Sequence, residues 1–333
     1  MRIAHFSDLH YCGKHLVEVD RCFTFAVDAA IAAGVDCAVI YGDATDHALD
    51  VHAPAVAALA RKVRRLADHC PVLMLQGTFS HEPPGTLEVF RLLGGRFAVH
   101  VADRIEQVAL LDDDTWQASD AWRFDEVPAG AKALFTCVPT INKAAVAATV
   151  GAGEAASAVG EQLTLLLQGL ARTNQSARSH EVPTVGVSHG TVFGCVTEHG
   201  VPMAGFDHEF TTGTLFSAAA SAFLLGHIHK HQVWEEGGRL VAYAGSVARL
   251  HYGEEGEKGF LLWDVGAKGA ALSLIPTPAR RTVEIAFDGP PDLEQLRRQA
   301  LQRELAGAYV RVRWTVAEED RQHFYFEVLV QYQ

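Results

Sequence analysis

Short apolar runs that end at an Asp or a His recur along the chain. The runs cover residues 2–6, 36–41, 72–75, 184–188 and 222–225, and each one is typical of a β-strand. The residues that follow them are Asp8, His10, Asp43, His81, His189, His227 and His229. Ligands of α/β sheets bind outside the carboxyl ends of the strands, so we expect these side chains to meet there. The chain has 17 His among 333 residues, so chance is a poor explanation for an Asp or a His after each of the five runs.

Helical patterns separate several of these runs. Residues 19–33 carry apolar side chains at helical spacing and end at Gly34, and residues 53–68 form a similar pattern with Pro54 in the first turn. Residues 144–172 predict a loose helix that becomes firm from Glu161, whereas residues 85–137 read as strands and hairpins. The segments 233–234, 240–243 and 260–263 read as consecutive antiparallel strands. The pattern as a whole predicts an α/β fold.

The residues that follow the strands suit a metal centre. Two carboxylates and four imidazoles, without a cysteine, favour manganese, iron or zinc. The set is Asp8, His10, Asp43, His189, His227 and His229. Two neighbouring ions need a shared anionic ligand, for which Asp43 is the natural candidate. Such a pair supports hydrolysis of a phosphate ester, since the ions lower the pKa of a bound water and hold the phosphoryl oxygens.

The order of these motifs resembles the calcineurin-like metallophosphoesterase family over roughly residues 1 to 250. Residues 243–246 and 250–254 further resemble the closing stretch of the SbcD-type DNA-repair exonucleases. The resemblance implies a four-layer α-β-β-α sandwich over residues 1–276, followed by a small α+β capping, DNA-binding-like domain over residues 277–333. It also implies two divalent ions, with Mn²⁺ expected first and Fe²⁺ or Zn²⁺ as alternatives.

The resemblance also assigns roles to individual residues. Asp8, His10 and His229 would hold one ion, His189 and His227 the other, and Asp43 would bridge them. His81 would stabilise the transition state or act as general acid, oriented by Glu82.

One segment departs from the family pattern. The family has G-N-H-D/E, whose Asn is a ligand of the second metal, whereas this chain has the sequence G-T-F-S-H-E over residues 77–82. Alignment on the His makes Ser80 the substitute ligand, and alignment on the Gly makes it Thr78. A hydroxyl is a poorer ligand than an amide oxygen, so the second ion is expected to bind weakly or to depend on a substrate oxygen.

The C-terminal region and one loop supply candidate substrate contacts. Residues 282–287, 309–314 and 324–330 read as strands and residues 292–304 as a helix. Alternation along the second strand places Arg311 and Arg313 on one face, where phosphate contact is expected. His47 lies in a loop beside Asp43, where guiding substrate and simple solvation are equally good interpretations.

Composition limits the partners. The formal net charge of −12 argues against a general electrostatic grip on DNA or on anionic membranes, although a partner subunit would be able to supply a basic surface. The six cysteines are scattered, no stretch approaches the ~20 apolar residues of a membrane span, and the N-terminus lacks a signal-peptide pattern, so we expect a cytoplasmic protein. The resemblance implies DNA, an SbcC-like SMC-family ATPase and a second copy of the chain as partners.

Three functions remain open at this point. The first is a two-metal DNA phosphodiesterase, and the second is a phosphodiesterase that acts on small phosphodiesters, nucleotides or phosphoproteins. The third is a weakened nuclease kept as a scaffold for the ATPase, suggested by the missing Asn.

Overall fold

The computed structural model describes residues 1–47, 49–93, 95–141, 152–197, 209–254, 256–289, 292–302 and 305–315. The chain divides into a large unit, Met1–Leu250 with Glu255–Ala279, and a small unit, His251–Glu254 with Arg280–Gln333. The sequence pattern placed the division at residues 276 and 277, three residues before the change of unit at Ala279.

The large unit is built on two sheets. The strand order of the first is β15-β14-β1-β2-β3-β4. Its strands are β1 (Arg2–Ser7), β2 (Cys37–Tyr41), β3 (Val72–Leu75), β4 (Val99–Ala102), β14 (Gly259–Val265) and β15 (Ala270–Pro276). β1 to β4 run parallel, while β14 pairs antiparallel with both β1 and β15. The carboxyl ends of β1, β2 and β3 therefore lie at one edge.

The second sheet has the order β12-β13-β11-β8-β7-β5-β6. Its strands are β5 (Glu106–Leu111), β6 (Trp116–Ala118), β7 (Ala131–Val138), β8 (Thr184–His189), β11 (Ala222–Gly226), β12 (Gln232–Glu236) and β13 (Arg239–Tyr243). The central strands β7, β8, β11 and β13 run parallel, and antiparallel hairpins flank them. A separate parallel pair, β9 (Thr191–Val192) and β10 (Glu209–Phe210), follows β8.

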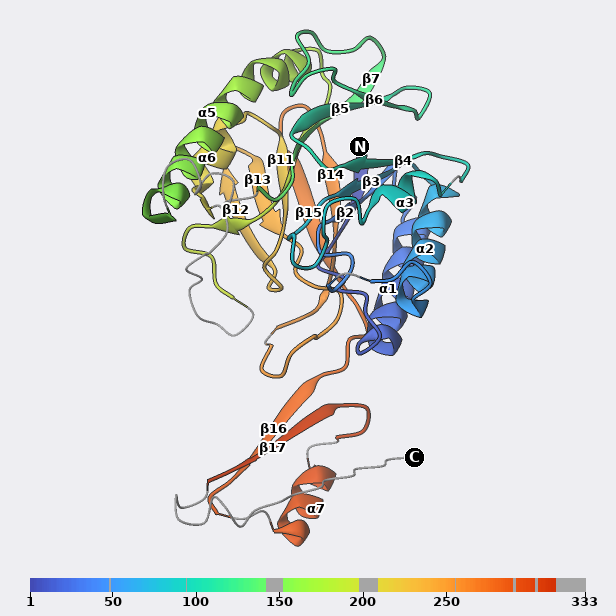
Figure 1. The fold of residues 1–333 in the computed structure, drawn as a ribbon, viewed down its shortest axis with the longest axis vertical. Coiled ribbons are helices and arrows are strands. Elements are labelled where there is room, and N and C mark those ends of the chain that lie inside the picture. The colour runs from blue at the N-terminus through green and yellow to red at the C-terminus, as the bar shows by residue number, and fades with distance from the viewer. Residues whose placement is uncertain are drawn as a thin grey trace. The chain divides into compact units, whose positions relative to one another are not determined.

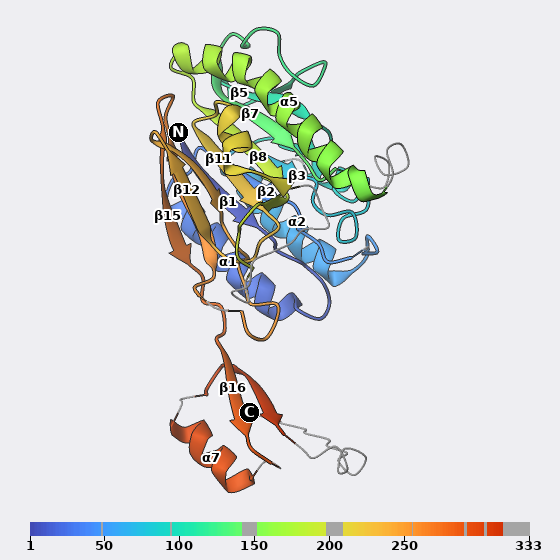
Figure 2. The ribbon, with the colours of Figure 1, turned by 90° about the vertical axis from the view of Figure 1, so that its left-hand side faces the viewer.

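The two sheets pack face to face through side chains that alternate along their strands. In β2 the odd-numbered residues, such as Val39, pack against the second sheet, and the even-numbered residues, such as Ile40, pack against helices. The helices on that side are α1 (Leu16–Ala32) and α2 (Pro54–Ala67), with the short α3 (Glu88–Arg91) before β4. On the far side of the second sheet lie α5 (Ala152–Ser179) and α6 (Thr212–Ser217) (Figures 1 and 2). This four-layer α-β-β-α arrangement confirms the predicted fold.

One predicted pairing was wrong. The segments that became β12 and β13 do form a hairpin, but β14 lies beside β1 in the other sheet rather than beside β13. Short apolar runs such as residues 240–243 and 260–263 do not specify which sheet a strand joins. Within the described residues, no helix has the length and apolar composition needed to span a bilayer.

The small unit contains β16 (Thr282–Phe287), α7 (Leu293–Gln302) and β17 (Tyr309–Trp314). The two strands pair in parallel, with Glu284 opposite Arg311. A helix between two parallel strands is a β-α-β unit, which agrees with the predicted mixed character. The predicted strand at residues 324–330 lies outside the described residues.

Candidate metal centre

Loops after five strands come together at one end of the sandwich. The His10 amide donates to the Asp43 carbonyl at 2.8 Å, which joins the loops after β1 and β2. The His227 amide donates to the Asp8 carboxylate at 2.9 Å, which joins β11 of the second sheet to β1 of the first. The strand-end residues that the sequence singled out are therefore neighbours in space.

The first cluster consists of Asp8, His10 and His229, whose potential ligand atoms all lie within 4.8 Å of one another. The Nε2 atoms of His10 and His229 are 3.1 Å apart. Bonds from zinc to imidazole nitrogen are about 2 Å long, so two nitrogens at this separation suit a single ion. Ser7 and the His227 amide both donate to the Asp8 carboxylate and fix its orientation. The donor set fits a divalent cation.

The second cluster consists of Asp43, His189 and His227, with the same 4.8 Å limit. Oδ2 of Asp43 lies 3.2 Å from Nε2 of His189. The Thr78 hydroxyl is 3.2 Å from each of these two atoms, and the Thr78 amide donates to Asp43 Oδ1 at 2.7 Å. One carboxylate, two imidazoles and a hydroxyl also suit a divalent cation. The role of Asp43 as a bridge between the two clusters remains a prediction.

The backbone at this edge is strained. Positive φ in a residue other than glycine is uncommon and is concentrated at functional sites. Of the eight such residues in the described part of the chain, five lie here: Asp8 (50°), His10 (49°), Asp43 (50°), His47 (61°) and His227 (104°). Gly77 is required for a steric reason, since a Cβ atom there would lie 2.2 Å from the Asp43 amide nitrogen. The fold maintains an unfavourable backbone in order to place these side chains.

Burial and charge shift the pKa values of the clusters. Burial alone would raise the pKa of Asp43, but His189 and His10 hold it well below its usual range. Burial alone would lower the pKa of His189, yet Asp43 raises it to about 9 in the metal-free chain. Burial, with His229 nearby, lowers the pKa of His10 to about 4. The Asp43 carboxylate therefore acts on a histidine of each cluster.

His81 is oriented by Asp46 rather than by Glu82. Nδ1 of His81 lies 2.9 Å from Oδ1 of Asp46, and the His81 ring packs edge-on against that of His10. With Nδ1 engaged, Nε2 is the ring nitrogen of His81 that is left to meet a substrate oxygen. Asp46 was not among the residues predicted from the sequence. Its position three residues after Asp43, in a loop rich in Asp and His, was the available signal.

Glu82 instead holds two loops together, which corrects its predicted role. Its carboxylate accepts from the amides of Ala44 at 2.6 Å and Gly77 at 2.7 Å, so it joins the loop after β2 to the loop after β3. The side chain is fully buried. Burial, together with the charge of Asp43, raises the pKa of Glu82 to about 7.

The two alternatives for the missing Asn differ clearly in the structure. The Thr78 hydroxyl lies between Asp43 and His189, as described above. Ser80, by contrast, is exposed. The geometry therefore favours Thr78 over Ser80 as the substitute ligand. The chain turns between Thr78 and His81, since the amides of His81 and Glu82 both donate to the Thr78 carbonyl.

The predicted substrate contacts are exposed but already engaged. Nδ1 of His47 lies 2.6 Å from Asp46, the carboxylate that also contacts His81. In the small unit Arg311 donates to Glu284 at 2.9 Å and Arg313 donates to the same carboxylate at 3.2 Å. Alternation did place the two arginines together, but it did not predict the acid that neutralises part of their charge.

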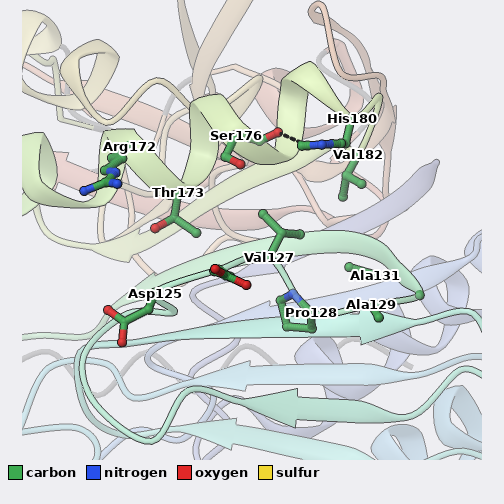
Figure 3. A pocket seen from close by; sticks show the side chains of 12 residues that line it. Asp125, Val127, Pro128, Ala129, Ala131, Arg172, Thr173, Ser176, His180 and Val182 are labelled. Atoms are coloured by element: carbon green, nitrogen blue, oxygen red, sulfur yellow. Dashed lines mark hydrogen bonds between the residues drawn. The ribbon is translucent and has the colours of Figure 1, made fainter.

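A hollow lined by residues outside the two clusters lies between the end of α5 and the segment before β7 (Figure 3). It has a volume of about 550 Å³, and its lining includes Asp125, Arg172, Thr173, Ser176 and His180. Thr173 donates to the Phe124 carbonyl and His180 contacts the Ser176 carbonyl. Among the described residues, none of the groups with metal-ligand geometry includes a residue of this hollow. We therefore assign the chemistry to the strand-end clusters.

No protein-family model matches the chain, and no curated protein matches it. Among solved structures, one similar chain is GAP50, the anchor in the inner membrane complex of Plasmodium, with 11% identity over 83% of this chain and 84% of that chain and a TM-score of 0.47. Another is a dimetal phosphatase from Danio rerio, with 11% identity over 82% of this chain and 98% of that chain and a TM-score of 0.47. Similarity at this level assigns neither activity nor substrate to the chain.

Proposed function

We propose that the chain is a metal-dependent phosphoesterase. One observation carries the proposal: two clusters of carboxylate and imidazole ligands lie side by side at the same end of the sandwich, joined by the contacts of Asp43 and His227. Bound divalent ions would supply a water of lowered pKa and hold the phosphoryl oxygens. The retained backbone strain argues against the scaffold interpretation, because strain of this kind persists only where the surrounding structure maintains it.

The protein residues supply positioning and proton transfer. Asp8 is held by two donors and presents its carboxylate in a fixed direction. His81 is half-buried, and its ring is fixed by Asp46, so it is suited to donating a proton from Nε2 to a departing ester oxygen. Glu82 keeps the loop that carries His81 against the loop that carries Asp43.

Within this class we propose a phosphodiesterase that acts on DNA, as in the SbcD-type nucleases. Support comes from the motif order and from the small unit that follows the sandwich, with Arg311 and Arg313 close together. An SbcC-like ATPase, a homodimer and Mn²⁺ as the working ion belong to the same proposal. A cytoplasmic location is proposed on the composition.

A second candidate substrate is a small phosphodiester or nucleotide. The observation that favours it is the pairing of both arginines with Glu284, in a chain with a formal net charge of −12. Charge neutralised within the protein is not available to release counterions from DNA.

The test uses the purified chain with Mn²⁺, end-labelled duplex and single-stranded DNA, and an aryl phosphodiester, alongside an Asp43→Ala variant. Cleavage of DNA that disappears in the variant supports the nuclease. Cleavage of the aryl ester alone moves the proposal to small phosphodiesters or to a nuclease that needs its partner. If neither substrate is cleaved with Mn²⁺, Fe²⁺ or Zn²⁺, the phosphoesterase proposal is wrong.

A further inference from the structure

The two ligand clusters differ in one respect. In the first, Asp8 is a carboxylate held by donors from Ser7 and the His227 amide. In the second, the oxygen atoms come from Asp43 and from the neutral hydroxyl of Thr78. Asp43 also acts electrostatically on His10 of the first cluster. The second cluster thus relies on a carboxylate whose charge is shared.

We propose that the Thr78 hydroxyl is a ligand of the second cluster and makes it the weaker of two unequal metal sites. The first ion binds at Asp8, His10 and His229 and stays bound, whereas the second binds at Asp43, His189, His227 and Thr78 and exchanges. The inference builds on the proposed two-metal centre, but it concerns binding and holds whether or not the chain hydrolyses a phosphoester.

The position of the hydroxyl supports its role as a ligand. Oγ1 of Thr78 lies 3.2 Å from Asp43 Oδ2 and 3.2 Å from His189 Nε2, which are two ligand atoms of the same cluster. The Thr78 amide is bonded to Asp43 Oδ1 at 2.7 Å, so the residue is fixed by its backbone. A hydroxyl among converging ligand atoms at these distances turns a lone pair toward a cation with little rearrangement of the chain.

The hydroxyl makes the site weak because it adds no negative charge, whereas affinity for hard cations depends strongly on the number of charged ligands. The first cluster has the full charge of the Asp8 carboxylate, while the charge of Asp43 acts on both clusters.

Ser80 offers a matched control. It carries the same functional group two residues along the same loop, but its side chain is exposed. Substitution at either position removes a hydroxyl group from the same loop. A change in metal binding that is seen at Thr78 but not at Ser80 therefore reflects loss of a ligand and not a general disturbance of the loop.

The experiment is equilibrium dialysis of the metal-free chain against Mn²⁺, with metal content measured by mass spectrometry and the bound ions observed by electron paramagnetic resonance. The wild-type chain is expected to bind in two phases, first an isolated ion and then an exchange-coupled pair. Thr78→Val should leave the first phase unchanged and weaken the second by about tenfold or more, as for lost contacts at metal sites. Thr78→Ser should retain the wild-type affinity, Thr78→Asn should bind the second ion more tightly, and Ser80→Ala should change neither phase.

Several results would overturn the inference. Two ions of equal affinity in the wild-type chain would remove the inequality. An unchanged second phase in Thr78→Val, or equal weakening in Ser80→Ala, would remove Thr78 from the site. If Thr78→Val does not fold, the order of second-site affinities in Thr78→Ser and Thr78→Asn decides the matter, and an Asn variant no tighter than wild type rejects the inference. Unequal sites in a chain without phosphoesterase activity would reject the proposed function and leave this inference standing.

Discussion

The metal centre and the basic face of the small unit, formed by Arg311 and Arg313, both bring charged side chains together, but they do so differently. At the centre Asp8, Asp43 and His189 are almost completely buried, and backbone amides fix the two carboxylates. In the small unit Arg311 and Arg313 are exposed side chains on a two-stranded sheet, and they share the Glu284 carboxylate. Five strained residues lie at the centre, whereas the described part of the small unit has no non-glycine residue with positive φ. Preorganisation distinguishes the two regions.

This difference predicts where substitutions have large effects. A group fixed before the substrate arrives acts on the transition state without further rearrangement. An exposed ion pair contributes little, because water and salt screen it. Changes at the centre should therefore alter activity by orders of magnitude, and changes on the basic face should have small effects that depend on salt.

The largest effect is expected for Asp43→Asn. The amide keeps the shape but removes the charge that acts on both clusters, so bound metal should fall below two ions per chain. The loss of several kcal/mol of charge stabilisation corresponds to a rate at least ~10³-fold lower. Metal content and hydrolysis of the aryl phosphodiester are measured together, with Asp113→Asn in the exposed turn after β5 as the control. Retention of full metal content and activity would contradict a central role for Asp43.

The next effect concerns proton transfer. Asp46→Asn should lower kcat by about 10² while metal content stays at two ions, because the His81 ring loses its carboxylate partner. The effect should shrink for an aryl ester with a good leaving group, which needs little protonation. An equal loss of kcat for good and poor leaving groups would argue against His81 as the general acid.

Several residues of the metal centre could be predicted from the sequence, because their positions depend on the strand that directly precedes them. Asp8, Asp43 and His189 each lie within two residues of a strand end, and a strand end specifies a place in an α/β fold. Asp46, the choice of Thr78 and the pairing with Glu284 depend on how a loop turns or on which strand lies alongside. Those features are set by contacts between distant segments, and periodicity does not report them.

A smaller effect is expected for Glu82→Gln, and it concerns stability. The amide group has one acceptor in place of two, so either the Ala44 or the Gly77 amide loses its partner, at a cost of about 1–3 kcal/mol in the free energy of unfolding. Chemical denaturation of the metal-free protein measures it. Unchanged stability would contradict the role of Glu82 in joining the two loops.

The same variant has a defined pH dependence. Burial and Asp43 raise the pKa of Glu82 from 4.5 to about 7, so the folded chain binds this proton more tightly than the unfolded chain does. The associated stability is fully present below pH 4.5 and is lost as the pH rises through about 7. The stability difference between wild type and Glu82→Gln should therefore be larger at acidic pH than at alkaline pH. If the stability difference between the two proteins instead grows with pH, the pKa of Glu82 is not raised in the folded chain.

The smallest effect is expected on the basic face, and it tests the nature of the substrate. Glu284→Gln removes the carboxylate that Arg311 and Arg313 share, and thereby frees their charge. If the substrate is DNA, this variant should bind it a few-fold more tightly at low salt, and the Arg311→Ala, Arg313→Ala double variant should bind it more weakly. Each contact between an arginine and a DNA phosphate that is gained in Glu284→Gln, or lost in the double variant, should change the slope of log K against log salt by roughly one.

The aryl phosphodiester is the internal control for these variants, because its hydrolysis depends on the centre alone and should be unchanged in both. Opposite shifts of DNA affinity in the two variants, at constant aryl esterase activity, would assign the basic face to the nucleic acid. If DNA affinity is the same in all three proteins, the arginines serve the small unit itself. The preorganised centre would then be the whole of the catalytic apparatus, and a small phosphodiester would be the better substrate.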